Sequence, residues 1–362
     1  MNNTRIDKLR ETMEQYQWDG ILISKSENQF YLSGFTGEGL MLISHQQAAL
    51  ITDFRYGQQA KSEAPDFEVI DLKNGKSHLS TASDLIKKLE ISNLAIESHH
   101  LTVKALTDLR SLLSAINVSS IKISETSGII EDMRSIKGQR EIQTIKKAQE
   151  ITDKTFVHIL DFIKPGISEI DITCEIEYYM KKNGAQGPAF KPIVVSGLRS
   201  SLPHGEPTSK KLVPGDFITL DFGARYDYYC SDMTRTIFLG KPTSKQVQIY
   251  NIVIEAQKRA IDSIKPGFLS NEIDKVARSL IEENGFGDFF GHGLGHGVGI
   301  EVHENPKLSH KSETKLEPGM VITVEPGIYI ENFGGVRIED MVIVTFDGCV
   351  NLTHSSKDLI YL

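Results

Sequence analysis

The sequence predicts an α/β protein with two domains, of which the second contains an internal repeat. The length of 362 residues suggests two domains, because a domain commonly holds about 150 residues. Strand-like and helix-like segments alternate in the first third, and landmarks in the rest recur 101 or 104 residues apart. We therefore expect one domain over 1–127, a linker over 128–138 and a second domain over 139–362.

The composition excludes several classes of function. The chain is 40% hydrophobic and 24% charged, which is ordinary for a globular protein, and its net charge of −8 offers no basic surface for nucleic acid or an anionic membrane. No run approaches ~18 apolar residues, and the N-terminus lacks the apolar region of a signal peptide. Cys174, Cys230 and Cys349 have no close spacing, which is typical of reduced thiols in a cytoplasmic protein. We therefore expect neither a nucleic-acid partner nor a membrane.

The first domain is predicted from the alternation of its segments. Strand-like runs occur at 20–24, 39–44, 48–52, 93–97 and 121–126, and helical patterns at 4–17, 81–90 and 102–116. Such alternation indicates helices packed against a sheet. We see no catalytic constellation in this third of the sequence.

The second domain is predicted from the repeat. The sequence DFIKPG from Asp161 recurs as DSIKPG from Asp262, and each is followed by a helical pattern ending in Asn-Gly. Later, VPGDFITLDFG at 213–223 recurs as EPGMVITVEPG at 317–327. One Lys-Pro-Gly match alone marks an ordinary helix exit. Three matches in the same order indicate that a helix–helix–strand–strand unit is duplicated.

The repeat places acidic residues at matching positions. Asp221 and Glu325 each follow a proline by seven residues. If each hairpin turns midway between its acids, Asp221 pairs with Asp232 and Glu325 pairs with Glu339. Facing like charges destabilise a sheet, and a buried carboxylate is costly unless it is paired or binds a metal. We therefore expect two divalent ions to neutralise the four carboxylates. A solvated sheet face and a pair of acids that share one proton are the alternatives.

A glycine-rich segment at 291–306, GHGLGHGVGIEVHENP, contains His292, His296 and His303. An imidazole commonly joins oxygen ligands, and glycines allow the backbone to pack close to a site, so we expect a metal to fix His296. A phosphate-binding loop is the weaker alternative, because the lysine of such loops is missing. His204 lies in a polar loop, which suits a substrate-facing residue or a plain exposed loop.

Together these motifs resemble the Xaa-Pro peptidases, which are the prolidases and aminopeptidase P enzymes of the pita-bread metallopeptidase superfamily. The resemblance is carried by PHG at 203–205, TLDFG and CSDMTRT within 219–236, HGLGHGVGIEVHENP at 292–306, VEPGIY at 324–329 and GVRIED at 335–340. NQFYLSGFTG and TDFRY in the first third resemble the creatinase-type N-terminal domain more weakly. The resemblance implies a pita-bread catalytic domain with a pseudo-twofold repeat.

The resemblance also implies a site. Two divalent metal ions per chain would be held by Asp221, Asp232, His296, Glu325 and Glu339, with Asp232 and Glu339 bridging them. Oxygen-rich ligation suits Mn²⁺, and Co²⁺, Zn²⁺ and Fe²⁺ are alternatives. The implied catalytic residues are Glu325, His303, His204 and Arg337, and the implied substrate contacts are His204, His292, His303, Tyr329 and Lys307.

The implied reaction is hydrolysis of the peptide bond before proline by a metal-bridging hydroxide, with short proline-containing peptides as substrates and a homodimer as the assembly. Some dipeptidases of the family place an arginine after the VHE motif, where this chain has Lys307, which lacks the bidentate fork. We expect an Xaa-Pro dipeptidase. An Xaa-Pro aminopeptidase that acts on longer peptides is the alternative, and a non-catalytic binding protein of the same fold is a distant one.

Overall fold

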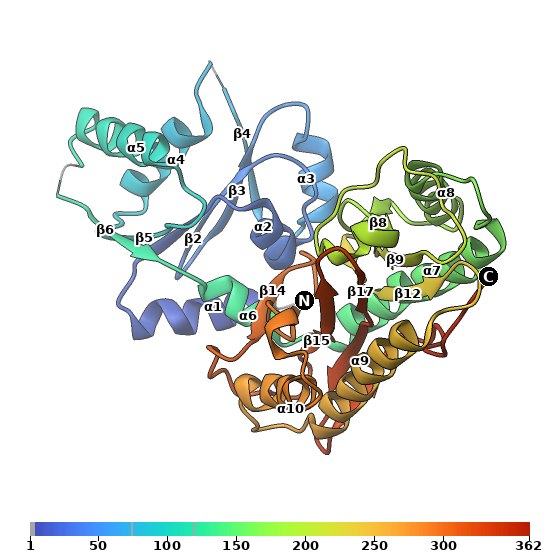
Figure 1. Cartoon of the computed structure of the whole chain (residues 1–362). Coiled ribbons are helices and arrows are strands. Elements are labelled where there is room, and N and C mark those ends of the chain that lie inside the picture. Colours follow the sequence, from blue (N-terminus) through green and yellow to red (C-terminus); the bar gives the residue numbers. More distant parts are fainter. Residues whose placement is uncertain (1–3, 74, 119) are drawn as a thin grey trace. The chain divides into compact units, whose positions relative to one another are not determined.

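The computed structural model describes residues 4–73, 75–118 and 120–362 and divides the chain into two compact units, Met1–Met133 and Arg134–Leu362 (Figure 1). The division falls inside the segment 128–138, which was predicted as a linker and in which helix α6 (Ile129–Ser135) forms. The predicted α/β class is confirmed, with sheets and helices in both units.

The first unit is a six-stranded mixed sheet with helices packed against it (Figure 1). Its strands follow the order β4-β3-β2-β1-β5-β6, and β1 runs parallel to β5 and antiparallel to β2. The strands are β1 (Gly20–Ile23), β2 (Leu40–Ser44), β3 (Ala48–Thr52), β4 (Glu68–Asp71), β5 (Asn93–Glu97) and β6 (Lys122–Thr126). The helices are α1 (Thr4–Gln15), α2 (Ser26–Ser33), α3 (Gly57–Glu63), α4 (His78–Lys88) and α5 (Val103–Ala115). The alternation in the sequence did not indicate α2, α3 and β4, which are short and carry few apolar residues.

The second unit confirms the predicted duplication. The first copy contains α7 (Gln139–Phe162), α8 (Glu169–Lys182), β8 (Ile193–Ser196), β9 (Phe217–Asp221) and β12 (Thr234–Phe238). The second copy contains α9 (Ser244–Ser263), α10 (Ser270–Glu283), β13 (Gly295–Gly297), β15 (Val321–Val324) and β18 (Asp340–Val344). The backbone N–H of Gly166 donates to Leu212 O at 2.9 Å, and the equivalent Gly267 N–H donates to Leu316 O at 2.7 Å, so both helix exits are fixed in the same way.

Shorter elements complete the second unit. They are β7 (Gly187–Pro188), the 3₁₀ helix η1 (Gly197–Ser201), β10 (Ala224–Tyr226), β11 (Tyr229–Cys230), η2 (Gly287–Phe289), β14 (Glu304–Leu308), β16 (Gly327–Ile330), β17 (Gly334–Arg337) and β19 (Cys349–Asn351). Strands β8, β9 and β12 form one sheet, and β14, β13, β15, β18 and β19 form another.

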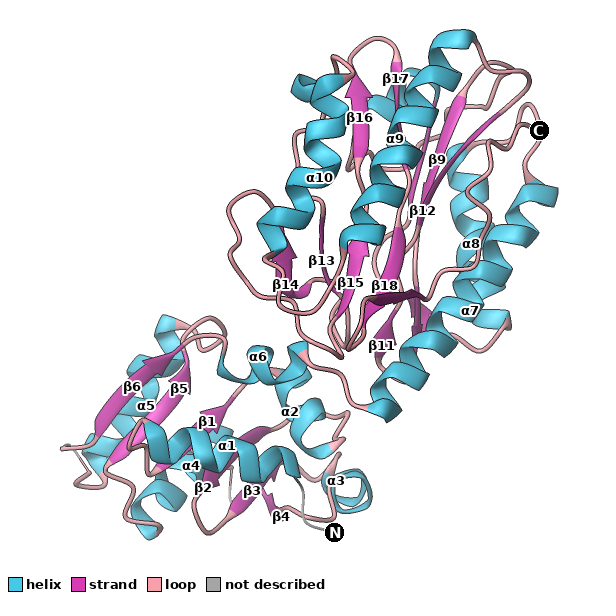
Figure 2. Ribbon diagram, turned by 90° about the horizontal axis from the view of Figure 1, so that it is seen from below, coloured by secondary structure: helices cyan, strands magenta, loops and turns pink. Residues whose placement is uncertain are grey.

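Each helix pair packs on the sheet of its own copy. Figure 2 shows α7 beside α8 and α9 beside α10. In α9, Val253, Ala256 and Ala260 lie three or four residues apart and are fully buried, so one face of the helix covers the strands. Ile322 and Val342 belong to the same apolar cluster. The result is a rigid support behind the strands that carry the acids.

The register of the second hairpin is as predicted. Val324 pairs with Asp340, and the pairs between β16 and β17 continue the same register. In this register Glu325 faces Glu339. The turn centres on residue 332, as the sequence suggested.

The register predicted for the first hairpin is wrong by two residues. Asp221 pairs with Thr234, and the register of β10 with β11 places Asp232 opposite Gly223. The reason is the turn, which falls on residues 227–228 with positive φ of 44° and 67°. Two consecutive residues with positive φ fit the type I′ turn that matches the twist of a hairpin.

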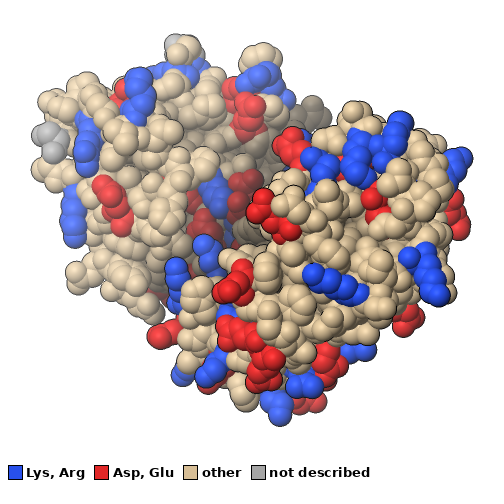
Figure 3. Space-filling model, viewed as in Figure 1, with Lys and Arg blue, Asp and Glu red and all other residues tan. Residues whose placement is uncertain are grey.

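Basic and acidic side chains are interspersed over the face of the molecule shown in Figure 3.

Among the described residues, none of the helices has both the length and the apolar character that crossing a bilayer requires.

Gly223 permits the close approach of the two strands of the first hairpin. A Cβ at this position would lie 1.7 Å from Ser231 O, which is a backbone atom that cannot move aside. We expect Gly223→Ala to lower the free energy of unfolding by about 3 kcal/mol or more, measured by urea denaturation. Gly291→Ala is the matched control, because nothing lies within 4 Å of the position of its Cβ, and its effect should stay within about 0.5 kcal/mol. Equal unfolding midpoints for the two variants would show that the hairpin does not depend on this close approach.

Candidate metal centre

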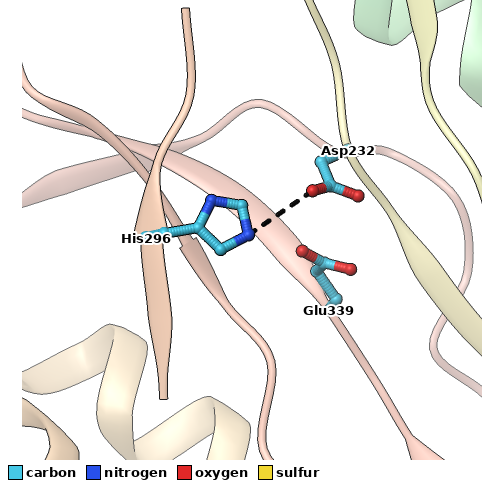
Figure 4. A group of neighbouring side chains, drawn as sticks. All are labelled: Asp232, His296 and Glu339. Atoms are coloured by element: carbon cyan, nitrogen blue, oxygen red, sulfur yellow. Dashed lines mark ion pairs between the residues drawn. The ribbon is translucent and has the colours of Figure 1, made fainter. Parts of the chain in front are cut away.

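The structure brings the predicted ligands together from both copies of the repeat. Asp221 ends β9 and Asp232 follows β11, while His296 lies in β13 and Glu325 follows β15. Glu339 lies between β17 and β18. Asp232, His296 and Glu339 each offer a ligand atom within 4.8 Å of the others (Figure 4). Side chains from both copies, of which Asp232 and Glu339 lie more than 100 residues apart in the sequence, therefore converge in one place.

Glu325 and Asp221 adjoin this group. His296 Nε2 lies 3.2 Å from Glu325 Oε1 and 3.6 Å from Asp232 Oδ2. Asp221 and Asp232 are close enough that the charge of Asp221 raises the pKa of Asp232, after burial as the main cause. Asp221, Asp232 and Glu339 are buried, and His296 and Glu325 expose 16% of their side chains.

Close packing against neighbouring backbone explains why the segment around His296 is rich in glycine. A Cβ on Gly295 would lie 2.1 Å from Thr323 O, and a Cβ on Gly297 would lie 2.1 Å from Asn305 O. Only glycine therefore allows β13 to fit between its neighbours. His296 Nδ1 lies 3.1 Å from Gly297 O and donates to it, so Nε2 faces the acids. A backbone carbonyl that fixes one ring nitrogen is the usual partner of a metal-binding histidine.

Two threonines orient the acids, and neither was predicted from the sequence. Thr323 Oγ1 donates to Glu325 Oε1 at 3.1 Å and accepts from His296 N at 3.0 Å. Thr234 Oγ1 donates to Glu339 Oε2 at 2.7 Å. Thr323 had a signal in the sequence, because residues two apart on a strand share a face, and Thr323 lies two before Glu325. Thr234 had none, since its partner belongs to the other copy.

Arg337 compensates part of the negative charge. Its Nη2 donates to Asp221 Oδ2 at 2.6 Å, and its Nη1 donates to the Tyr329 hydroxyl at 2.9 Å. The hydroxyl in turn donates to His292 Nε2 at 2.9 Å, since His292 Nδ1 donates to Gly293 O at 2.8 Å. Arg337 thus links an acid of the first copy to a tyrosine and a histidine of the second.

The pKa shifts show that the acids repel one another. Burial raises the pKa of Asp232 and of Glu339 well above the usual range, and the neighbouring carboxylates add to it. Burial opposes charge on His296 and Glu325 too. However, their hydrogen bond and mutual attraction raise the pKa of His296 to about 9 and lower that of Glu325 to about 2. A positive charge is therefore favoured at this place. Without a metal, the protonated ring of His296 provides such a charge.

The donor set fits divalent cations. It combines four carboxylates with one imidazole, and Arg337 is the single guanidinium that bonds to them among the described residues. Within that part of the chain, no group donates a hydrogen bond to the buried Asp221 Oδ1. An acceptor oxygen without a donor at a buried acidic cluster is the arrangement that a metal ion satisfies.

Of the further predicted site residues, His303 and Lys307 adjoin His296. The ring centroids of His296 and His303 are 4.4 Å apart. Burial is the main cause that lowers the pKa of His292 and of His303. His204 lies in the loop that follows the 3₁₀ helix η1, whose Ser200 accepts a hydrogen bond from Gly335 of β17. Lys307 pairs with His296 between β14 and β13. Paired residues in antiparallel strands point to the same face, which places Lys307 on the side of His296.

A buried ionic cluster, which was not predicted from the sequence, fixes the turn between His296 and Lys307. The Glu304 carboxylate bonds to Arg134, lies 3.2 Å from Lys137 Nζ, and accepts from Glu301 N at 3.1 Å. Arg134 also bonds to Glu301 Oε2 at 2.9 Å. The two basic residues lie more than 160 residues before their partners, in the segment predicted as a linker, so no spacing rule could connect them.

The chain was compared with known families and proteins. Residues 143–346 match the profile of metallopeptidase family M24, and residues 5–136 match that of the creatinase/prolidase N-terminal domain. A Xaa-Pro dipeptidase from Pyrococcus horikoshii is 42% identical over 99% of this chain and 99% of its own length. The solved structure of a Xaa-Pro dipeptidase from Bacillus anthracis is 44% identical, with a TM-score of 0.95 over 99% of both chains. An X-Pro aminopeptidase from Thermotoga maritima is 38% identical, with a TM-score of 0.91 over 99% of this chain and 100% of its own.

The stability of the metal-free protein should fall as the pH rises from about 6.5 to about 9. The folded chain holds the His296 proton up to a pKa of about 9, whereas the unfolded chain releases it near 6.5. The raised pKa values of Asp232 and Glu339 also make the stability fall as the pH rises. Stability that arises from a raised pKa is complete below the unfolded pKa and is lost as the pH passes the folded one.

Added Mn²⁺ should reverse this slope, because metal ligands bind in their deprotonated form. The measurement is thermal unfolding between pH 6 and 9.5 in the presence of chelator or of Mn²⁺. His310→Asn is the control, because His310 is exposed and should leave both profiles unchanged. Parallel profiles with chelator and with Mn²⁺ would argue against a metal at this site.

Proposed function

This chain belongs to metallopeptidase family M24, and from that premise we propose that it is an Xaa-Pro dipeptidase that works with two divalent metal ions. The observation that carries the proposal is the convergence of four largely buried carboxylates and His296, which come from both copies of the repeat. A buried group of acids whose charge is offset in part by Arg337 and one imidazole suits the cations that a peptidase employs.

The proposed ligands are Asp221, Asp232, His296, Glu325 and Glu339. Asp232, His296 and Glu339, whose ligand atoms lie within 4.8 Å of one another, would form the centre of this set. When bound, two such ions lower the pKa of a water molecule and polarise the carbonyl of the scissile bond. Mn²⁺ is the proposed ion, because oxygen ligands predominate.

The side chains around the metals supply proton transfer and orientation. The Glu325 carboxylate bonds to Thr323 and lies 3.2 Å from His296 Nε2, and it is proposed to take the proton of the attacking water. It can then pass this proton to the leaving proline nitrogen. His303 or His204 donates an N–H to the developing oxyanion, and the lowered pKa of His303 keeps its ring neutral. Arg337 fixes Asp221 and the Tyr329 hydroxyl, with His292 behind them.

Lys307 is the proposed partner of the substrate's C-terminal carboxylate. It pairs with His296 in the register of β14 with β13, which supports a position on the same face of the sheet. A second candidate function is an Xaa-Pro aminopeptidase. It is favoured by the 38% identity to the Thermotoga maritima enzyme and by the lysine, which offers a point charge and no bidentate fork.

The proposed setting is a cytoplasmic homodimer that takes short proline-containing peptides. Its support is the family and the three cysteines, which have no close spacing.

The function is tested by comparing substrates of different length. With Mn²⁺ present, we expect the protein to hydrolyse Ala-Pro at least ten times more efficiently than Ala-Pro-Ala, measured as kcat/KM by release of alanine. Ala-Ala is the control for proline specificity and should be cleaved poorly. Rapid cleavage of the tripeptide would favour the aminopeptidase. No cleavage of either proline peptide, together with no bound metal, would favour a non-catalytic protein.

The role of Lys307 is tested by Lys307→Met, which keeps the length of the side chain and removes its charge. A charge-assisted hydrogen bond contributes about 1.5–3 kcal/mol, so KM for Ala-Pro should rise roughly 10- to 100-fold with a small change in kcat. KM for Ala-Pro amide, which lacks the carboxylate, should hardly change. Lys311→Met is the matched control on the exposed surface. Equal rises in KM for the acid and the amide would rule out carboxylate binding by Lys307.

A further inference from the structure

We propose that Glu169 is a positioning residue, which closes the loop 197–208 and thereby fixes His204, the histidine proposed to face the substrate. The inference rests on the proposed function, because the role of His204 toward substrate does. Glu169 acts through the loop and is not itself a catalytic residue.

The two carboxylate oxygens of Glu169 hold opposite ends of this loop. Oε1 accepts from Ser196 N at 2.8 Å and from Ser196 Oγ at 2.9 Å, at the point where β8 ends and the loop begins. Oε2 accepts from Thr208 N at 2.9 Å and from Thr208 Oγ1 at 2.8 Å, where the loop ends. Arg199 Nε also donates to Oε2, at 3.2 Å. A single side chain thus receives five hydrogen bonds and brings the two ends of the loop together.

The loop depends on these polar bonds, because it buries little apolar surface of its own. Leu198 is 60% exposed and Leu202 is 47% exposed. Inside the loop, Arg199 bonds to the carbonyl oxygen of Glu206. Ser200 Oγ accepts from Gly335 N of β17 at 2.9 Å, two residues before Arg337. The loop that carries His204 is therefore held by the carboxylate at its ends and by the strand of Arg337 at its middle.

The second copy of the repeat shows that the fold itself does not require a carboxylate at this position. Glu169 corresponds to Ser270, and each is the first residue of its helix. The backbone bonds are alike, since Glu169 N donates to Lys210 O at 3.1 Å and Ser270 N donates to Thr314 O at 2.9 Å. In the second copy the side chain is a serine, whose hydroxyl donates to the carbonyl oxygen of Ser312 at 2.8 Å.

The difference between the copies points to function. A fully buried carboxylate is costly unless donors surround it, and Glu169 is 0% exposed. The first copy carries this charge and supplies five hydrogen-bond donors for it. In the second copy the corresponding helix begins with a neutral serine. In the first copy this carboxylate closes the loop with His204, whereas the segment with His303 in the second copy is held by Glu304 and its basic partners.

The test uses Glu169→Gln in the whole 362-residue chain loaded with Mn²⁺. The amide keeps the shape of the side chain, but its nitrogen cannot accept from the donors at one end of the loop. We expect unchanged metal content and circular dichroism, faster amide hydrogen exchange in 197–208, and at least a tenfold fall in kcat/KM for Ala-Pro. Asp171→Asn is the matched control, because Asp171 is an exposed acid in the same helical turn. It should lower stability without changing exchange in the loop or kcat/KM.

A double-mutant cycle separates positioning from a general loss of stability. If Glu169 acts through His204, Glu169→Gln in a His204→Asn background should lower kcat/KM less than twofold further, because coupled residues are not additive. Additive losses would overturn the inference, as would unchanged exchange in the loop. If Glu169→Gln does not fold, Thr208→Val removes one donor and keeps the carboxylate, and the same expectations apply. Failure of the proposed function would instead appear as a wild-type protein that does not cleave Ala-Pro, and loop exchange would still decide whether Glu169 closes the loop.

Discussion

The mutual repulsion of carboxylates that share a buried space is the constraint on which the second unit depends. Four acids meet there, and burial together with their neighbours raises the pKa of Asp232 and Glu339 well above the usual range. Two positive groups offset part of this repulsion, Arg337 at Asp221 and the protonated His296 at Glu325. The offset is incomplete, because two positive charges face four carboxylates when all four are ionised. A bound cation would therefore stabilise the fold at a pH where all four acids are ionised.

The duplication explains how a chain arrives at such a cluster. Each copy ends a central strand in an acid, Asp221 in one and Glu325 in the other, and each strand is supported from behind by its own helix pair. The copies then differ in the neighbours of these acids. Glu325 is bonded by Thr323 of its own strand, whereas Asp221 is bonded by Arg337 of the other copy. The cluster is therefore a joint product of both halves, and neither half could form it alone.

The sequence predicted what is local or repeated, and it failed where distant segments meet. The duplicated unit and the pairing of Glu325 with Glu339 followed from matched landmarks and a centred turn. The same centring failed for Asp221, because Asp227 and Tyr228 adopt positive φ and shift the turn by one position. Neither residue is a glycine, so the usual turn signal was missing. The contact of Arg337 with Asp221 spans 116 residues, and no periodicity reports on such a pair.

The residues proposed to face the substrate share a further property, which is that buried charge and not apolar packing holds their loops. His204 lies on a loop whose ends are closed by Glu169, and His303 lies on a turn whose Glu304 is bonded by Arg134 and lies beside Lys137. Buried ion pairs contribute little net stability, but their directional bonds specify one geometry. Apolar contacts would stabilise these segments without selecting one position for an imidazole. A peptidase of this fold therefore gains from using charge at these loops, since two histidines on irregular backbone must face the same bond.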